Sequence, residues 1–446
     1  MSEFFLQIVV GLCFLGLVII LFFEKTDYIF YSVLFIVIAS LISAIFLEQA
    51  RNLEFYIEVM EWEVIFFLIG MFTVVEVLKE NKIFDEIGQK VVGKYGESPR
   101  RMFYVVCIVS TLMASIVEDL SIAMIFGPII VIACRKLKIS AAPFLLGMTV
   151  CINIAATLTP FGSAQNVLIT NEFNLDFLWF ISRLGIYFVI TLGSTLFILD
   201  KVSLRKDIAR CQVEECEEEL DEGETIAESK IPKEVFYKNM VALVIYILLL
   251  VLIPEIYLAG ILGALLFIVI NPVHEDNKND GKKRISMGHY IKKIDFRLIF
   301  FFMCLFIFVG LMQINGTIAV FERILENVSR DNEFALAIII LLSTSILSGF
   351  LDNTPVTVIF IPILKILLNL PEFHRGPLMV AFILGINLGG NFLPQGSAAD
   401  LMTLQISQEY KVEDLNYKRL FKVGGLFSLF HIVLGIGYLA ILVYFF

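Results

Sequence analysis

The chain has 446 residues, of which 58% are hydrophobic and only 17% are charged. Because soluble proteins carry roughly 25% charged residues, this composition excludes a soluble protein and indicates one that crosses a membrane several times. The net charge of -10 comes mainly from an acidic run between Cys211 and Ser229, which predicts a solvated linker and not an acidic binding surface.

Apolar stretches of about 20 residues, the length of one membrane crossing, divide the chain into two halves. The first half, residues 1–199, has predicted spans at 4–23, 28–47, 62–79 and 177–199, a broken segment at 102–135 and an interrupted one at 143–170. An acidic linker follows at 200–238. The second half, residues 239–446, repeats this order, with spans at 239–253, 255–271, 298–312 and 420–446, a broken segment at 336–370 and an interrupted one at 377–403.

The two halves align without a gap at one constant offset, which we call the repeat offset and define as the step from Pro128 to Pro362. The repeat offset also relates the following pairs: Glu118 and Asp352, Asn153 and Asn387, Pro160 and Pro394, Gly162 and Gly396, Ser163 and Ser397, and Ala164 and Ala398. Chance matches do not explain a single offset shared by Pro, Gly and Asn positions, so the sequence predicts an internal duplication.

Lysine and arginine residues predict the orientation. The connection after the third span is basic, and the far end of the first broken segment carries Arg135, Lys136 and Lys138. With both ends cytoplasmic, this segment is a re-entrant hairpin, and each half has five crossings plus one hairpin. An odd number of crossings makes the halves inverted repeats. The predicted fold is therefore an all-α polytopic membrane protein with both termini extracytoplasmic.

The hairpin tips carry polar residues inside apolar sequence. Thr354 followed by Pro355 is typical of an N-cap and a first helical position. A carboxylate in mid-membrane costs roughly 2.5–3.5 kcal/mol and tends to be functional, so the tip acids are candidate ion or proton sites. The candidates at the tips are Glu118, Asp119, Ser121, Asp352, Asn353 and Thr354.

The interrupted segments contain Pro and Gly two residues apart, which unwinds a helix. Ser163 and Ser397 are predicted to cap the helices that resume. Freed carbonyls suit a small cation, and half-helix amide ends suit an anion; the alternative is a kink needed only for packing. Asp400 can also simply cap its helix or line the mouth of the cavity. The candidates are Asn153, Thr157, Gly162, Ser163, Asn166, Asn387, Asn391, Gly396, Ser397 and Asp400.

At these residues the chain resembles the ion transporter superfamily, which includes arsenite permeases, NhaD-type sodium/proton antiporters, the P protein and divalent anion/sodium symporters. The resemblance covers nearly the whole chain and is most specific at Asp352-Asn353-Thr354, at 153–166 and at 387–398. It implies two inverted repeats of five helices, a homodimer, and cation and substrate sites at the tips and interruptions. The tip Glu118-Asp119-Leu120-Ser121 stands where the carboxylate symporters have Ser-Asn-Thr, which favours the cation- or proton-exchanging branches.

The predicted function is secondary active transport by alternating access, with sodium/proton antiport through Glu118, Asp119 and Asp352 as the first choice. The alternative is a proton- or sodium-coupled permease for arsenite, a dicarboxylate or citrate. No organic cofactor is expected, only Na+ or H+ as the coupling ion. The candidate sodium ligands are Asp119, Asn153, Asp352, Asn353 and Asn387.

Other classes lack their motifs. There is no His-Glu-x-x-His and no phosphate-binding Gly-x-x-x-x-Gly-Lys-Ser/Thr loop, so neither an intramembrane enzyme nor an ATP-driven pump is expected. The seven Cys show no disulfide or zinc spacing. The expected partners are a small ion or anion, membrane lipid and a second copy of the chain, with no nucleic acid. The expected location is a prokaryotic cell membrane.

Overall fold

The computed structural model describes residues 2–20, 28–95, 98–117, 119–204, 231–272, 274–276, 283–285, 287–294, 296–318, 332–351, 353–368, 373–412 and 414–445. The chain forms two compact units. Unit 1 comprises Met1–Ile65, Asp295–Gly390 and Ile432–Phe446, and unit 2 comprises Phe66–Ile294 and Asn391–His431. Each unit therefore contains segments from both halves of the sequence.

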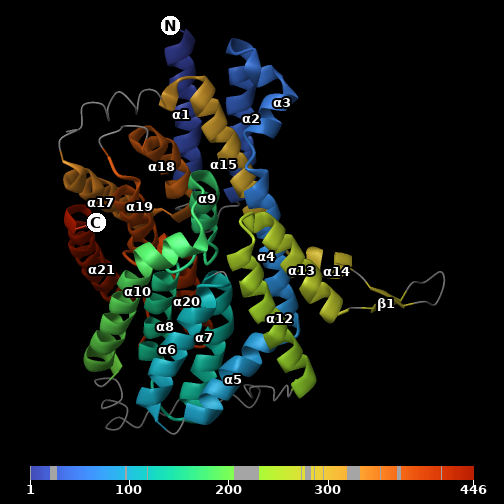
Figure 1. Ribbon diagram of the computed structural model, residues 1–446, viewed down its shortest axis with the longest axis vertical. Helices are drawn as coiled ribbons and strands as arrows, with labels where there is room; N and C mark the ends of the chain where they lie inside the picture. The colour runs from blue at the N-terminus through green and yellow to red at the C-terminus, as the bar shows by residue number, and fades with distance from the viewer. Residues whose placement is uncertain are drawn as a thin grey trace. The chain divides into compact units, whose positions relative to one another are not determined.

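Unit 1 contains the second predicted hairpin. Its elements are α1 (Ser2–Ile20), α2 (Tyr28–Phe46), the 3-10 helix η1 (Gln49–Arg51), α3 (Leu53–Glu58), α15 (Phe296–Ile314), α17 (Glu333–Phe350), α18 (Asn353–Leu368) and α19 (Arg375–Gly389). Helices α17 and α18 are the two arms of the hairpin, and α17 packs along α19 (Figure 1).

Unit 2 contains the first hairpin, with arms α6 and α7. Its elements are α5 (Ile83–Tyr95), α6 (Pro99–Ala114), α7 (Asp119–Lys136), α8 (Ala142–Ala155), α9 (Ala164–Phe173), α10 (Phe177–Leu199), the π-helical turn η2 (Asp200–Leu204), α12 (Lys233–Leu252), α13 (Ile256–Ile270), α14 (Met287–Ile291), the 3-10 helix η3 (Pro394–Gly396) and α20 (Ala398–Glu409). Helices α4 (Trp62–Glu80) and α21 (Tyr417–Phe445) pass from one unit to the other. Figure 1 shows α6, α7, α8 and α20 packed together.

The prediction of an all-helical membrane protein is confirmed. In the described part of the chain, six helices are long and apolar enough to cross a bilayer: Ile29–Phe46, Phe177–Val202, Lys233–Leu252, Phe296–Ile314, Glu333–Phe350 and Tyr417–Phe445. One short antiparallel hairpin, β1 (His274–Asp276) with β2 (Lys283–Ile285), lies in the loop after α13. The acidic linker ends earlier than expected, because α12 already begins at Lys233.

The helix bounds recur at the repeat offset. Both ends of α15 follow the ends of α4 by this offset, and the first residues of α17, α18 and α20 follow those of α6, α7 and α9 by the same step. This recurrence supports the predicted duplication, and the inverted orientation of the halves stays a prediction. The structure describes neither Glu118 nor Asp352, so the two tip acids lie outside the described residues.

Candidate functional site

The first helix interruption, residues 156–163 between α8 and α9, is held by one side chain. The Asn166 amide nitrogen donates to the Ala156 carbonyl and, at 2.9 Å, to the Thr159 carbonyl. Asn166 is fully buried, so these two bonds replace the water that would otherwise satisfy the freed carbonyls. The interruption is therefore a fixed turn and not a frayed helix end.

The same turn is tied to the first hairpin. The Thr159 hydroxyl donates to the Ser115 carbonyl at the end of α6. A Cβ at position 162 would lie 3.0 Å from the Ser115 oxygen and 3.1 Å from the Ala114 oxygen. Glycine is needed at this position because two stretches of backbone meet there.

The second interruption is organised differently. Helix α19 ends at Gly389, and in η3 the Gly396 amide donates to the Leu393 carbonyl at 2.8 Å. A Cβ at Gly424 of α21 would come within 2.6 Å of the Asn391 carbonyl oxygen. A glycine of α21 thus lets the backbone of the interruption approach that helix closely.

Four predicted residues meet in a buried polar cluster in unit 2, which we call the Asp400 cluster: Asn153, Asn391, Ser397 and Asp400. The Asn153 amide nitrogen donates to Asn391 Oδ1 at 2.7 Å and to Asp400 Oδ1 at 3.0 Å. The Ser397 hydroxyl donates to Asn153 Oδ1 at 2.9 Å. All four side chains are at most 2% exposed, and among the described residues Asn391 Nδ2 has no hydrogen-bond partner.

Helix α7 brings a second carboxylate to this cluster. Its contacts with α20 pair Gly127 with Ile406 and Arg135 with the Tyr410 carbonyl. The later residue of α7 contacts the later residue of α20, so the two helices run parallel and their first turns lie at the same end. Asp119 at the start of α7 interacts electrostatically with Asp400 in the first turn of α20.

The predicted capping by serine is wrong at both interruptions. Ser163 precedes α9 and Ser397 precedes α20 in extended conformation, as N-caps do, but neither side chain accepts a bond from its own helix. Ser397 turns instead to Asn153, because that buried amide offers an acceptor. Ser163 Oγ is buried and has no hydrogen-bond partner in the part of the chain that the structure describes. The first-turn amides of α9 and α20 therefore lack a serine cap.

The second hairpin has its own polar contacts in unit 1. Helix α18 begins at Asn353, so Thr354 and Pro355 lie inside its first turn. The prediction that Thr354 is the N-cap and Pro355 the first helical residue is therefore wrong. The Ser348 hydroxyl donates to Asn353 Oδ1 and to the Ile386 carbonyl of α19. Asn353 and Thr354 are buried. These contacts fix the start of α18 against α19.

The structure thus groups the predicted residues in three sets. The Asp400 cluster, with Asp119, forms the first, and the first interruption forms the second. The third set is in unit 1, where the Asn387 amide donates to the carbonyl one turn earlier in its own helix. The three sets are Asp119, Asn153, Asn391, Ser397 and Asp400; Thr157, Gly162, Ser163 and Asn166; and Asn353, Thr354 and Asn387. Ser121 lies in the first turn of α7, and Gly396 ends η3.

Sequence reasoning missed one pair next to the Asp400 cluster. The hydroxyls of Thr149 and Thr403 are hydrogen-bonded to each other and fully buried. Thr149 lies one helical turn before Asn153, and Thr403 lies one turn after Asp400. Helical spacing puts each on the same face as its neighbour, and this signal would have found them.

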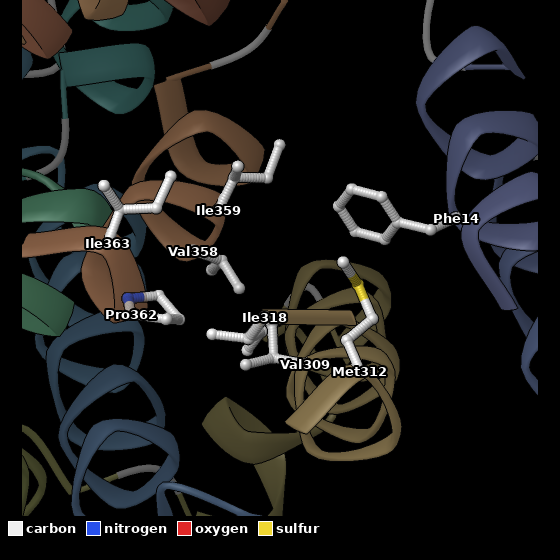
Figure 2. A pocket seen from close by; sticks show the side chains of 8 residues that line it. All are labelled: Phe14, Val309, Met312, Ile318, Val358, Ile359, Pro362 and Ile363. Carbon is white, nitrogen blue, oxygen red and sulfur yellow. The ribbon is translucent and has the colours of Figure 1, made fainter. Parts of the chain in front are cut away.

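The one described pocket of unit 1 contains none of the predicted residues. Figure 2 shows side chains of α18 on one side and of α1 and α15 on the other, all of them apolar. The lining residues are Phe14, Val309, Met312, Ile318, Val358, Ile359, Pro362 and Ile363. Such walls offer no ligand to an ion.

Comparison with known proteins gives a family match over most of the chain. The sequence model of the citrate transporter family matches residues 17–277 and 258–446. A 46 kDa membrane protein of Mycobacterium leprae is 25% identical over 78% of this chain and 79% of its own length. The P protein of Sus scrofa is 22% identical over 86% of this chain and 54% of its own length.

A solved structure shares the fold. The YdaH transporter of Alcanivorax borkumensis superposes with a TM-score of 0.57 over 85% of this chain and 84% of its own, at 11% identity. An identity this low supports similarity of fold alone.

Proposed function

The chain belongs to the citrate transporter family, and we propose that it carries a small carboxylate anion of the citrate type across the membrane together with a cation. Membership makes it an integral membrane protein and a secondary transporter of the anion-permease type. The proposal adds the substrate class and the coupling to a cation.

The observation that supports anion binding is that α9 and α20 in unit 2 both begin without a side-chain cap from their N-cap serine. Helices α9 and α20 both begin in buried surroundings after a serine whose side chain makes no cap hydrogen bond. The amide end of a helix attracts an anion. The buried, unpartnered Ser163 hydroxyl adds a donor of the kind that a carboxylate accepts.

Cation coupling is supported by the acids beside these amide ends. Asp400 is 1% exposed and interacts electrostatically with Asp119. Two carboxylates inside a membrane protein are expensive unless a positive charge accompanies them. A cation that enters with the anion would supply that charge.

Sodium/proton antiport is the second candidate. It is favoured by the same two acids and needs no anion at the helix starts. Anion uptake that depends on a cation gradient indicates the first function. Exchange of sodium for protons in the absence of any anion indicates the second.

The test uses the purified full-length chain in liposomes that contain a trapped pH dye. Uptake of radiolabelled citrate is measured with an inward sodium gradient, with an inward proton gradient and with neither. The proposal expects citrate uptake that one of the gradients accelerates, and competition from other small di- and tricarboxylates. Proton efflux on addition of sodium without citrate, and no citrate uptake under any gradient, would overturn it in favour of antiport.

A further inference from the structure

Two contacts between elements of unit 2 use a base from an arm of the first hairpin. Arg100 at the start of α6 donates to the carboxylate of Asp200, where α10 passes into η2, through Nε at 2.9 Å and Nη2 at 2.5 Å. Arg135 near the end of α7 donates to the carbonyl of Tyr410, which follows α20. Both bases therefore bind groups of the protein itself.

These two contacts lie at the same end of unit 2. A Cβ at Gly147 of α8 would lie 2.5 Å from the ring of Phe103, near the start of α6. A Cβ at Gly162, after α8, would lie 3.0 Å from the carbonyl oxygen of Ser115, at the end of α6. Helix α6 therefore runs in the same direction as α8 and begins beside its start. Because α8 begins soon after α7 ends, the end of α7 lies there as well.

Each of the four contact residues is followed directly by an exposed base. Within the described part of the chain none of these bases forms an ion pair. Lys138 is a further exposed base at this end. Acids are fewer, since Asp200 is bound to Arg100, and Glu409 and Asp414 flank the fourth base in the sequence. The described residues at this end therefore carry a net positive charge. The four bases are Arg101, Lys136, Lys201 and Lys411.

An exposed apolar face of α10 leads to these bases. Its side chains are between 53% and 66% exposed, and helical spacing puts them on one face: Ile186, Val189, Ile190 and Phe197. The ammonium group of Lys201 lies 4.1 Å from the centre of the Phe197 ring. Bases directly beyond an apolar membrane helix are typical of the boundary between the hydrocarbon and the lipid headgroups.

We propose that this end of unit 2 binds one anionic phospholipid, with its phosphate at Arg101 and Lys201 and an acyl chain along the exposed face of α10. A free phosphate would leave the apolar face uncovered, and a zwitterionic lipid would leave the positive charge unbalanced. Lys136, Lys138 and Lys411 add to the positive potential at this end. Like charges gathered in this way repel one another unless an anion lies among them.

The test is equilibrium binding of tritiated dioleoylphosphatidylglycerol to the purified full-length chain in detergent. Saturable binding is expected, with displacement by the unlabelled lipid, roughly tenfold weaker displacement by dioleoylphosphatidylcholine and none by glycerol phosphate. Arg101→Gln combined with Lys201→Gln should weaken binding by on the order of tenfold, because each base near a membrane surface adds to the attraction for an anionic lipid. Arg183→Gln is the matched control, since it removes one base near the opposite end of α10 and should leave the affinity unchanged.

Lys136→Gln combined with Lys411→Gln removes charge from the same end without changing α10. It should also weaken binding, so it decides the question if the first variant does not fold. Wild-type affinity in the variant of Arg101 and Lys201, or equal displacement by phosphatidylcholine, would overturn the inference. Competition by glycerol phosphate would mean a site for phosphate alone and would overturn it too. Absence of saturable binding to wild type would do the same, and is the result expected if the acidic linker covers these bases.

Discussion

Single amides decide how each interruption is held. Asn166 satisfies the carbonyls of Ala156 and Thr159 with one side chain, and Asn153 uses its amide to join Asn391, Ser397 and Asp400. A buried carbonyl without a donor is costly. Asn166 therefore replaces helix bonds that the first interruption loses, whereas Asn153 joins the side chains of the second interruption to one another.

Asn166→Ala should destabilise the chain by on the order of 1–3 kcal/mol, since it leaves buried carbonyls without their donor. The measurement is the apparent unfolding temperature of the purified protein in detergent. Gln49→Ala is the control, because Gln49 is exposed in η1. Equal unfolding temperatures for the two variants would show that the first interruption does not depend on Asn166.

Glu80, just beyond the predicted span 62–79, gives a pH dependence with a defined sign. Partial burial acts to raise its pKa, but hydrogen bonds and charges from His289 and Lys293 outweigh burial, so the pKa of Glu80 is lowered. An acid with a lowered pKa stabilises the fold above its unfolded pKa, and this contribution is lost as the pH falls through the folded pKa.

Glu80→Gln should therefore lower the unfolding temperature at neutral pH, and the difference from wild type should shrink as the pH falls below the ordinary pKa of a glutamate and through the lowered pKa of Glu80. Unfolding temperatures of both proteins across this range provide the measurement. A difference that stays constant with pH would mean that the charge of Glu80 is not what stabilises its contact with His289 and Lys293.

At the scale of elements, α17 and α19 approach each other closely at two glycines of α19. A Cβ at Gly385 would overlap the side chain of Thr344. A Cβ at Gly389 would lie 2.6 Å from the Cα of Ser345. Small residues four apart let membrane helices approach this closely. Ser348 continues the seam by donating to the Ile386 carbonyl, so the first arm of the second hairpin is fixed to α19.

Gly389→Ala should force these helices apart and cost about 1–3 kcal/mol, because the obstructing atoms are backbone and cannot turn away. The expected result is a lower unfolding temperature and slower citrate counterflow. Gly437→Ala in α21 is the matched control, since nothing lies within 4 Å of its added Cβ. If the two alanine variants behaved alike, the close approach of α17 and α19 would not contribute to stability.

At the scale of the whole molecule, the sequence predicted the elements better than the contacts between them. Apolar length and the repeat offset located the hairpins and interruptions closely, because both depend on local composition. The repeat offset pairs Asn153 with Asn387, whereas the fold joins Asn153 to Asn391 and Asp400. Such pairs depend on how distant helices pack, which no local pattern records. The capping expectation for Ser397 was wrong for the same reason, because a residue far away in sequence takes its hydroxyl.

The predicted topology of the second half is a count of membrane crossings. It gives one crossing each to α12, α13, α15 and α21, and it counts α19 with α20 as one interrupted crossing. The predicted hairpin α17–α18 enters and leaves the membrane on the same side, so it does not add to the count. Five crossings would place the C-terminus on the side opposite the acidic linker, and the basic loops predict a cytoplasmic linker.

Reporter fusions in a bacterial host test this orientation. Alkaline phosphatase fused to the C-terminus should be active, because it folds only outside the cytoplasm, and green fluorescent protein at the same place should be dark. The fluorescent protein inserted in the linker at 205–230 should be bright, with the phosphatase there inactive. Bright fluorescence at both places would require an even number of crossings between them, and the second half would then not be an inverted copy of the first.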